Sequence, residues 1–247
     1  MQNAALDHDL VSPRVSRPSL SLVPAWRMVD ENRALGCLRG GGLLLAKGDI
    51  GYGLLGRSER AIRSMYELKG RPETNPCVFA GNWDVLDEVA VVTPEERAFL
   101  QRVVGYSTCA AVFPARMESR LIQGLDPWVR EHAITRGTLA VFMRCGGFFE
   151  RLVGRAYSEG WCFVGSSGNP SSMGNCFRFD EVPESIRRGV DCALDHGTAA
   201  LENPERKATT ILNFTNGTLK REGVNAARIR ADFEAFLSRR DGLAVSA

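Results

Sequence analysis

Short apolar segments alternate with amphipathic helical segments along this chain, and their irregular order limits the fold class. Residues 41–46 form an apolar run typical of a buried strand. Residues 58–68 carry apolar side chains at helical spacing, behind a serine at position 58 that suits an N-cap. Near the end, Asn216-Gly217 indicates a hairpin that pairs residues 210–214 with residues 218–221. Interleaved elements with a hairpin favour an α/β fold with a mixed sheet over a regular βαβ repeat.

The rest of the pattern fits one α/β domain preceded by a short arm. Thr93, Pro94 and Glu96 have the spacing of a capping box with proline at the first helical position, so a helix should begin there and run to about residue 104. Residues 1–28 show no sustained period and are interpreted as a tail or loosely docked arm, and residues 29–240 as the domain. Further strands are expected at 77–80, 108–113, 138–143, 161–165 and 190–194, and further helices at 33–38, 148–158 and 225–237.

Composition excludes several functional classes. The 31 basic and 29 acidic residues give a net charge of +2, which argues against a dedicated nucleic-acid surface but leaves room for a small cationic pocket. The longest apolar run, residues 40–46, is far shorter than the roughly 20 residues that span a bilayer, and no secretory leader is expected. The 7 cysteines stand singly and there are only 3 histidines, so we expect reduced thiols, a cytoplasmic location and no zinc site.

Three polar clusters have the chemistry of an anion site. Lys69 and Arg71 follow a predicted helix and are fixed by a proline, so they are able to clasp a triphosphate, although cations also suit a helix C-terminus. Residues 165–169 (G-S-S-G-N) follow an apolar strand and offer hydroxyl and amide donors; the alternative is a plain polar turn. Their spacing does not match the G-x-S-x-G nucleophile elbow. Arg221 ends the predicted hairpin and is either a third phosphate contact or a solvated residue of an edge strand.

The order of these patterns resembles the YrdC-like family. Residues 49–54 (D-I-G-Y-G-L) are similar to the family's P-T-[DE]-T-V-Y-G-L turn, and residues 67–72 to its K-x-R-P segment. The resemblance covers roughly residues 31–230, and its most specific element is the K-x-R…S-x-N combination. Later similarities are residues 166–172 to T-S-A-N-x-S-G, residues 190–197 to V-D-x-x-x-D-x-G, and residues 219–223 to L-R-x-G.

The resemblance implies an α/β fold with a YrdC-like twisted mixed β-sheet and flanking helices around a concave, positively charged cavity. Enzymes of this family combine ATP, bicarbonate and L-threonine into threonylcarbamoyl-AMP and pyrophosphate, a step toward a tRNA modification. By resemblance we expect a nucleotidyltransferase of the L-threonylcarbamoyladenylate synthase type. Its expected ligands are ATP with Mg²⁺, bicarbonate, and an amino acid or amine as acceptor. Protein partners in tRNA modification or carbamoyl transfer are also implied.

The family's site residues are carried over position by position. Lys69 and Arg71 would hold the triphosphate as catalytic residues. The other implied roles are nucleotide binding by Ser166, Ser167, Asn169 and Arg221, and an acceptor pocket formed by Lys47, Asp49 and Tyr52.

The chain departs from the family pattern on the acceptor side. Lys47-Gly48 stands in place of Pro-Thr and Ile50-Gly51 in place of Thr-Val, so two hydroxyls are lost from the turn. That loss places threonine as the substrate in doubt.

A third departure is Phe142, which occupies the position of an arginine in the family's V-R-V strand. Arg144 or Arg116 could replace that arginine, and the sequence does not decide between them. Two alternatives therefore stay open beside the synthase. One is a diverged carbamoyltransferase-type enzyme with another small-molecule acceptor, which would need a partner to supply carbamoyl phosphate hydrolysis. The other is a non-catalytic nucleotide- or RNA-binding module.

Overall fold

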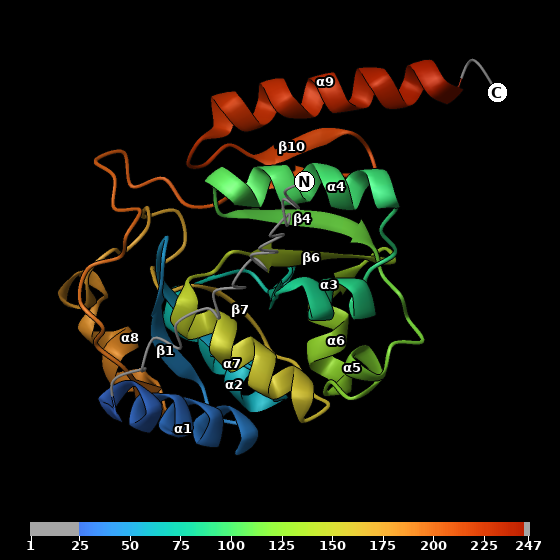
Figure 1. Ribbon diagram of the computed structural model, residues 1–247. Helices are drawn as coiled ribbons and strands as arrows, with labels where there is room; N and C mark the ends of the chain where they lie inside the picture. Colours follow the sequence, from blue (N-terminus) through green and yellow to red (C-terminus); the bar gives the residue numbers. More distant parts are fainter. Residues whose placement is uncertain (1–24, 245–247) are drawn as a thin grey trace, which may run out of the picture.

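The computed structural model describes residues 25–244, in which one twisted mixed sheet runs through the whole domain (Figure 1). Ten strands join in the order β10-β9-β4-β6-β3-β7-β2-β1-β8, with β5 paired to β6. The pairs β1/β8, β3/β6 and β4/β9 are parallel and the others antiparallel. The strands are β1 (Leu44–Gly48), β2 (Gly51–Gly56), β3 (Val78–Ala80), β4 (Cys109–Pro114), β5 (Ile134–Thr135), β6 (Thr138–Met143), β7 (Val164–Ser167), β8 (Cys192–Ala193), β9 (Thr210–Asn213) and β10 (Thr218–Arg221).

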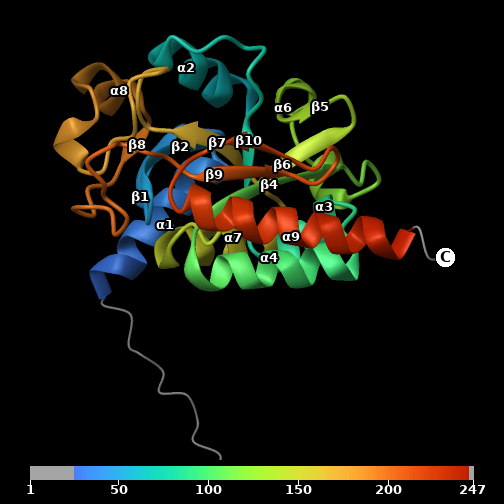
Figure 2. The same ribbon diagram turned by 90° about the horizontal axis from the view of Figure 1, so that it is seen from above.

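Helices flank both sides of this sheet. Figure 2 shows α2, α6 and α8 on one side of the strands and α4, α7 and α9 on the other. The mixed sheet with flanking helices confirms the predicted fold class. The helices are α1 (Ala25–Arg39), α2 (Glu59–Lys69), α3 (Trp83–Val89), α4 (Pro94–Tyr106), α5 (Arg120–Gln123), α6 (Pro127–Ala133), α7 (Gly147–Ser158), α8 (Glu184–Gly189) and α9 (Ala226–Ala244), with a 3₁₀ turn at Phe179–Glu181.

An aromatic cluster attaches α4 and α9 to one face of the sheet. Phe113 of β4 stacks on Phe214 with ring centroids 4.6 Å apart, and Phe99 of α4 lies 4.8 Å from Phe236 of α9. Phe233 packs against the same group, and all of these rings are buried. Burying aromatic rings is among the largest single contributions to a core. Because the helices cover this face, the opposite face of β9, β4 and β6 is left for the cavity described below.

Local signals explain where the helices near the site begin and end. Ser58 caps α2 by accepting a hydrogen bond from the Ala61 amide, and Gly70 ends α2 in a left-handed conformation with φ 56°. Glycine adopts this left-handed conformation without steric strain, because it has no Cβ atom. Thr93 and Glu96 form the predicted capping box of α4. These caps confirm the predicted starts of both helices, and the end of α2 fixes the direction in which Arg71 leaves it.

Some elements differ from the sequence predictions. Residues 1–24, predicted as part of an arm, lie outside the described residues. Helix α1 begins at Ala25, earlier than the predicted helix at 33–38. Its Asn32 accepts a hydrogen bond from Arg155 of α7 at 2.8 Å. Strand β2 was seen only as a family turn, because three glycines give it a low strand propensity although it is wholly buried. The predicted hairpin exists, but Thr218 pairs with Asn213, so four residues rather than two connect the strands.

All seven cysteines are free thiols, most of them buried. Within the described range, no helix is both long and apolar enough to cross a bilayer.

Candidate functional site

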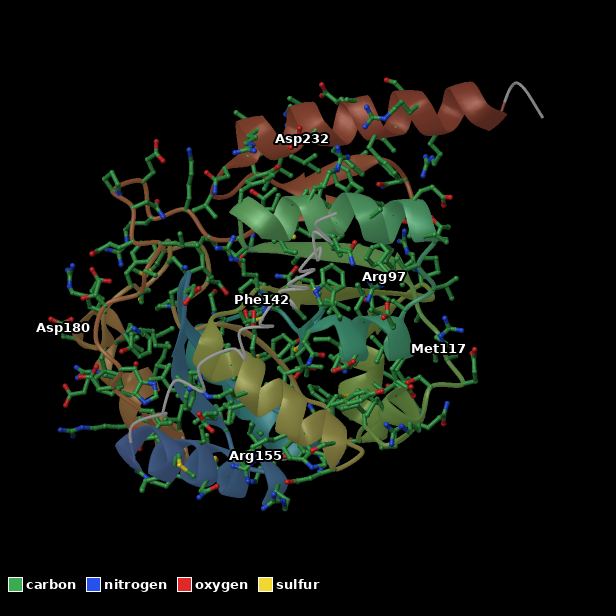
Figure 3. All side chains as sticks on the ribbon, viewed as in Figure 1. Arg97, Met117, Phe142, Arg155, Asp180 and Asp232 are labelled. Carbon is green, nitrogen blue, oxygen red and sulfur yellow. The ribbon has the colours of Figure 1, made fainter. Side chains whose placement is uncertain are left out.

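A cavity of about 840 Å³ lies on the open face of the sheet. Its floor follows the period-two alternation of the strands, because Thr138, Ala140 and Phe142 of β6 face the cavity while the residues between them are buried in the core. Ala110 and Val112 of β4 continue the floor. Figure 3 marks Phe142 near the middle of the sheet. The floor of the cavity is therefore formed by strands of the sheet and not by a loop alone.

Four basic side chains line this cavity, namely Arg71, Arg136, Lys220 and Arg221. Among the described residues that form its wall there is no aspartate or glutamate. Positive charges that share a low-dielectric space repel each other, and an anion bound between them offsets this repulsion. The cavity is therefore suited to a polyanionic ligand.

Arg71 is held by the backbone at the start of β3. Its Nη2 donates to the Pro76 carbonyl at 3.0 Å, while its Nε is buried and has no hydrogen-bond partner among the described residues. On the other side, Nε of Arg221 donates to the Thr209 carbonyl at 2.9 Å. Desolvation and then the Arg71 charge lower the pKa of Arg221, which still remains a cation at neutral pH. The positive charges of Arg71 and Arg221 therefore lie in the wall of the same cavity.

Lys69 lies behind the cavity and does not form part of its wall. Only 3% of the residue is exposed, and its Nζ donates to the carbonyls of Ser167 and Asn169, with Ser167 Oγ at 3.5 Å. Burial, followed by the nearby Arg71 charge, lowers the pKa of Lys69 to about 7. The structure therefore gives Lys69 a supporting place under the Ser166–Asn169 segment, instead of the direct contact with the cavity that Arg71 has.

This burial of Lys69 predicts a specific pH dependence of stability. Because the folded pKa is lowered, the unfolded chain binds more protons between about pH 7 and pH 10.5, so stability due to this group rises with pH in that window. The slope is at most about 1.4 kcal/mol per pH unit. The Lys69→Met variant should lose this slope. Urea unfolding of both proteins at about pH 7.5 and 9.5 checks it, and parallel changes in the two proteins would contradict the prediction.

The end of β7 and the segment after it add uncharged polar groups. Ser166 and Ser167 line the cavity, and Asn169 is buried beside them without being part of the wall. Buried side-chain atoms without a partner gather here: of the five in the described residues, four belong to Arg71, Asn169, Ser171 and Asn175. A buried polar atom left unpaired costs about 1–3 kcal/mol. Two of the four, Arg71 and Asn175, line the cavity, so unpaired polar atoms are available to a ligand there.

Of the three residues expected to form an acceptor pocket, Lys47 and Tyr52 lie side by side, because they are directly opposite each other in the β1–β2 pair. Tyr52 lines the main cavity, but its hydroxyl points away and donates toward Asp195 at 3.1 Å and the Gly197 carbonyl at 2.9 Å. Lys47 and Asp49 line a separate cavity of about 240 Å³ beside the start of α7. Lys47 donates there to the Thr198 carbonyl at 2.9 Å. Lys47 and Asp49 therefore do not contribute to the wall of the main cavity.

Neither candidate for the missing arginine reaches the cavity. Phe142 is part of the wall, whereas Arg144 donates to the Val104 carbonyl at 2.9 Å and Arg116 to the Ala90 carbonyl at 3.3 Å. The position that carries an arginine in the family pattern is thus apolar in this chain, without a substitute from either residue.

Sequence reasoning missed two wall residues of interest. Arg136 occupies a two-residue turn between β5 and β6 with Gly137, both with positive φ (54° and 71°); an X-Gly turn between two strand-like segments was the available signal. Asn175 has no comparable signal. Its Nδ2 donates to the Ile50 carbonyl, and a Cβ placed on Gly51 would lie 2.7 Å from that nitrogen. Gly51, at φ 134°, therefore leaves the space that the Asn175 carboxamide fills.

Comparison with known proteins now assigns the family. The sequence profile of the Sua5/YciO/YrdC family, described as "Telomere recombination", matches residues 36–223. This chain belongs to that family, which confirms the resemblance drawn from its motifs. A search of curated protein sequences returned no match.

Solved structures of the same fold include a hypothetical protein, smu.1377c, from Streptococcus mutans UA159. It is 18% identical, with a TM-score of 0.70 over 82% of this chain and 90% of that one. E. coli YciO is 18% identical, with a TM-score of 0.63 over 80% and 90%. P. abyssi Sua5 complexed with L-threonine is 24% identical, with a TM-score of 0.63 over 79% of this chain. This chain covers 54% of that Sua5, about half its length.

Proposed function

We propose that this protein binds ATP in the main cavity and uses it to make a carbamoyl-adenylate. The observation that carries the proposal is a wall with four basic side chains, no acidic one among the described residues, and unpaired buried polar atoms beside it. Membership of the Sua5/YciO/YrdC family supports the same chemistry. The acceptor is an amino acid or another primary amine.

The reaction proceeds in two balanced steps. The acceptor amine adds to bicarbonate with loss of water and forms an N-carboxylate. An oxygen of that carboxylate then attacks the α-phosphorus of ATP, the bond to the β-phosphate oxygen breaks, and pyrophosphate leaves with its electron pair. N-carboxylates hydrolyse readily in water, so a recessed cavity protects the intermediate.

Each wall residue has a role that follows from its place. Arg71 and Arg221 stabilise the phosphate charge from two sides, and forked guanidinium donors suit the oxygens of the leaving pyrophosphate. The hydroxyls of Ser166 and Ser167 donate to phosphate or ribose oxygens. Lys69 keeps that segment in place through its carbonyls. It is a positioning residue, because it does not border the cavity.

Magnesium would be bound mainly by the triphosphate itself. The described residues contain no group of three or more acidic, histidine or cysteine side chains able to hold a metal ion. The cavity wall offers neutral oxygens only, such as those of Ser166, Ser167 and Asn213. Mg²⁺ tolerates this arrangement, because it commonly binds through substrate phosphates and water.

Pyrophosphate release tests the proposal directly. With ATP, Mg²⁺ and bicarbonate, release should depend on an added amine acceptor, and mass spectrometry should detect the corresponding carbamoyl-adenylate. ATP with bicarbonate alone should give no more than background. The absence of release with every amino acid and amine, in a protein that still binds ATP, would overturn the synthase in favour of a nucleotide-binding module.

A further inference from the structure

An apolar row crosses the cavity floor. Ile211 of β9 is paired in register with Ala110 of β4, which is paired with Phe142 of β6, and this residue pairs with Ala80 of β3. All four line the cavity. Side chains directly opposite one another on adjacent strands lie within contact distance on the same face. The four therefore form one continuous apolar strip, here called the Phe142 row.

At its β9 end the row meets Arg221 of β10, which is paired in register with Ile211 and also lines the cavity. Polarity also rises from the row toward the start of β6. The next register row contains Asn213, Val112 and Ala140, and one step further along β6 stands Thr138. The Phe142 row itself has no polar side-chain atom. Its backbone amides and carbonyls lie in strands that are paired on both sides, so they are already used in the sheet ladder.

The aromatic ring of Phe142 dominates the strip. Ala80 and Ala110 are small and almost wholly buried, whereas Phe142 is partly accessible from the cavity. Ile50 and Leu55 supply further apolar wall from the β1–β2 turn and from β2. A ligand group that lies on this strip gains from burial of carbon and finds no hydrogen-bond partner there.

Of the ligands in the proposed reaction, an aliphatic side chain fits this strip best. The phosphates are drawn to the four basic residues, and bicarbonate is charged. A nucleobase carries donors and acceptors around its edge, and burying these without partners costs free energy. We propose that the acceptor is a primary amine with an apolar side chain, such as an aliphatic L-amino acid, and that this side chain lies on the Phe142 row. This inference rests on the proposed function and specifies its acceptor.

L-Valine and L-threonine provide the matched pair for a test, because they have nearly the same shape and differ by a methyl in place of a hydroxyl. An apolar pocket discriminates against such an added hydroxyl by roughly 10–100-fold. We therefore expect kcat/KM for acceptor-dependent pyrophosphate release to be higher for L-valine than for L-threonine by that factor. Direct titration of both amino acids into the protein with ATP analogue bound gives the same comparison without turnover.

Phe142→Asn places a hydrogen-bonding group on the row. It should lower kcat/KM for L-valine at least tenfold and reduce the valine-to-threonine ratio, while the Kd for ATP stays within about twofold. Phe148→Asn is the control, since this phenylalanine of α7 borders the smaller cavity and is absent from the main wall. It should leave the ratio unchanged. Circular dichroism and thermal unfolding of both variants establish that they are folded.

The possible outcomes distinguish the acceptor preference from the proposed synthesis of a carbamoyl-adenylate. Equal or higher activity and affinity with L-threonine in the parent would overturn this inference while leaving the synthase intact. If Phe142→Asn weakened ATP binding and left the valine-to-threonine ratio unchanged, the row would hold the nucleobase, and the inference would again be wrong. Failure to bind ATP at all would instead remove the proposed function. Binding of neither amino acid in the presence of the ATP analogue would remove the inference alone.

Discussion

Replacing Arg71 by alanine should weaken ATP binding by roughly 10–150-fold, corresponding to about 1.5–3 kcal/mol for loss of a charge-assisted hydrogen bond. Arg71 faces the cavity, and its Nε has no partner among the described residues, so the guanidinium has capacity left for a phosphate. The fold should survive, because the Arg71 guanidinium contributes few structural contacts, among them a hydrogen bond to the Pro76 carbonyl. Titration calorimetry with ATP and Mg²⁺ measures the effect.

Arg102→Ala is the matched control for that measurement. Arg102 is an exposed arginine of α4 whose guanidinium lies 5.5 Å from the Phe99 ring, away from the cavity. Its loss should leave the ATP affinity unchanged within about twofold. Equal affinities in the parent and in Arg71→Ala would show that the triphosphate binds elsewhere, even though the family assignment stands.

Gly223→Ala should be the most damaging single methyl addition near the site. A Cβ at Gly223 would lie 2.0 Å from the Ala208 carbonyl oxygen and 2.6 Å from the Thr210 nitrogen, both backbone atoms. No side-chain rotation relieves such a contact, so the backbone has to move. We expect a loss of about 3 kcal/mol or more in the free energy of unfolding, at the upper end of overpacking effects. Ala208 and Thr209 line the cavity, so ATP binding should fall with stability.

Gly154→Ala is a control that should change the free energy of unfolding in the opposite direction. Gly154 lies inside α7, and a Cβ there would meet nothing within 4 Å. Alanine should therefore stabilise the helix by about 0.5–1 kcal/mol. Chemical denaturation of the three proteins checks both changes. A Gly223→Ala protein as stable as the parent would mean that the segment 208–210 is free to shift.

The fold class and the family were accessible from sequence because their signals are local and ordered. The capping box at Thr93 and the cap at Ser58 mark helix starts through hydrogen bonds that involve only neighbouring residues. The family motifs at residues 67–72 and 166–172 keep their order along the chain. Strand β2 was missed, because its three glycines give it a low strand propensity and its pairing with β1 and β7 partly depends on residues far away in the sequence.

The arrangement of side chains in the site was less accessible, because it depends on distant contacts. Lys69 and Arg71 are two residues apart, yet one lies under the serine segment and the other in the wall. The position of Lys69 is set by carbonyls about a hundred residues later in the chain. Similarly, Lys47 and Tyr52 were predicted to share one pocket, yet Lys47 borders the smaller cavity and Tyr52 the main one. Motif spacing carries no information on which face such a residue occupies.

The pairing of Gly51 with Asn175 constrains how the acceptor turn is able to evolve. The carboxamide of Asn175 occupies the volume that a side chain at position 51 would need, and the backbone at Gly51 has φ 134°. The Cys176 carbonyl oxygen lies even closer, 2.6 Å from such a Cβ, so a branched residue at position 51 requires a shift of this backbone as well as of the Asn175 side chain, and a changed turn conformation. The crowding at Gly51 therefore acts as an evolutionary barrier between the turn of this chain and the family pattern, which has a valine at this position.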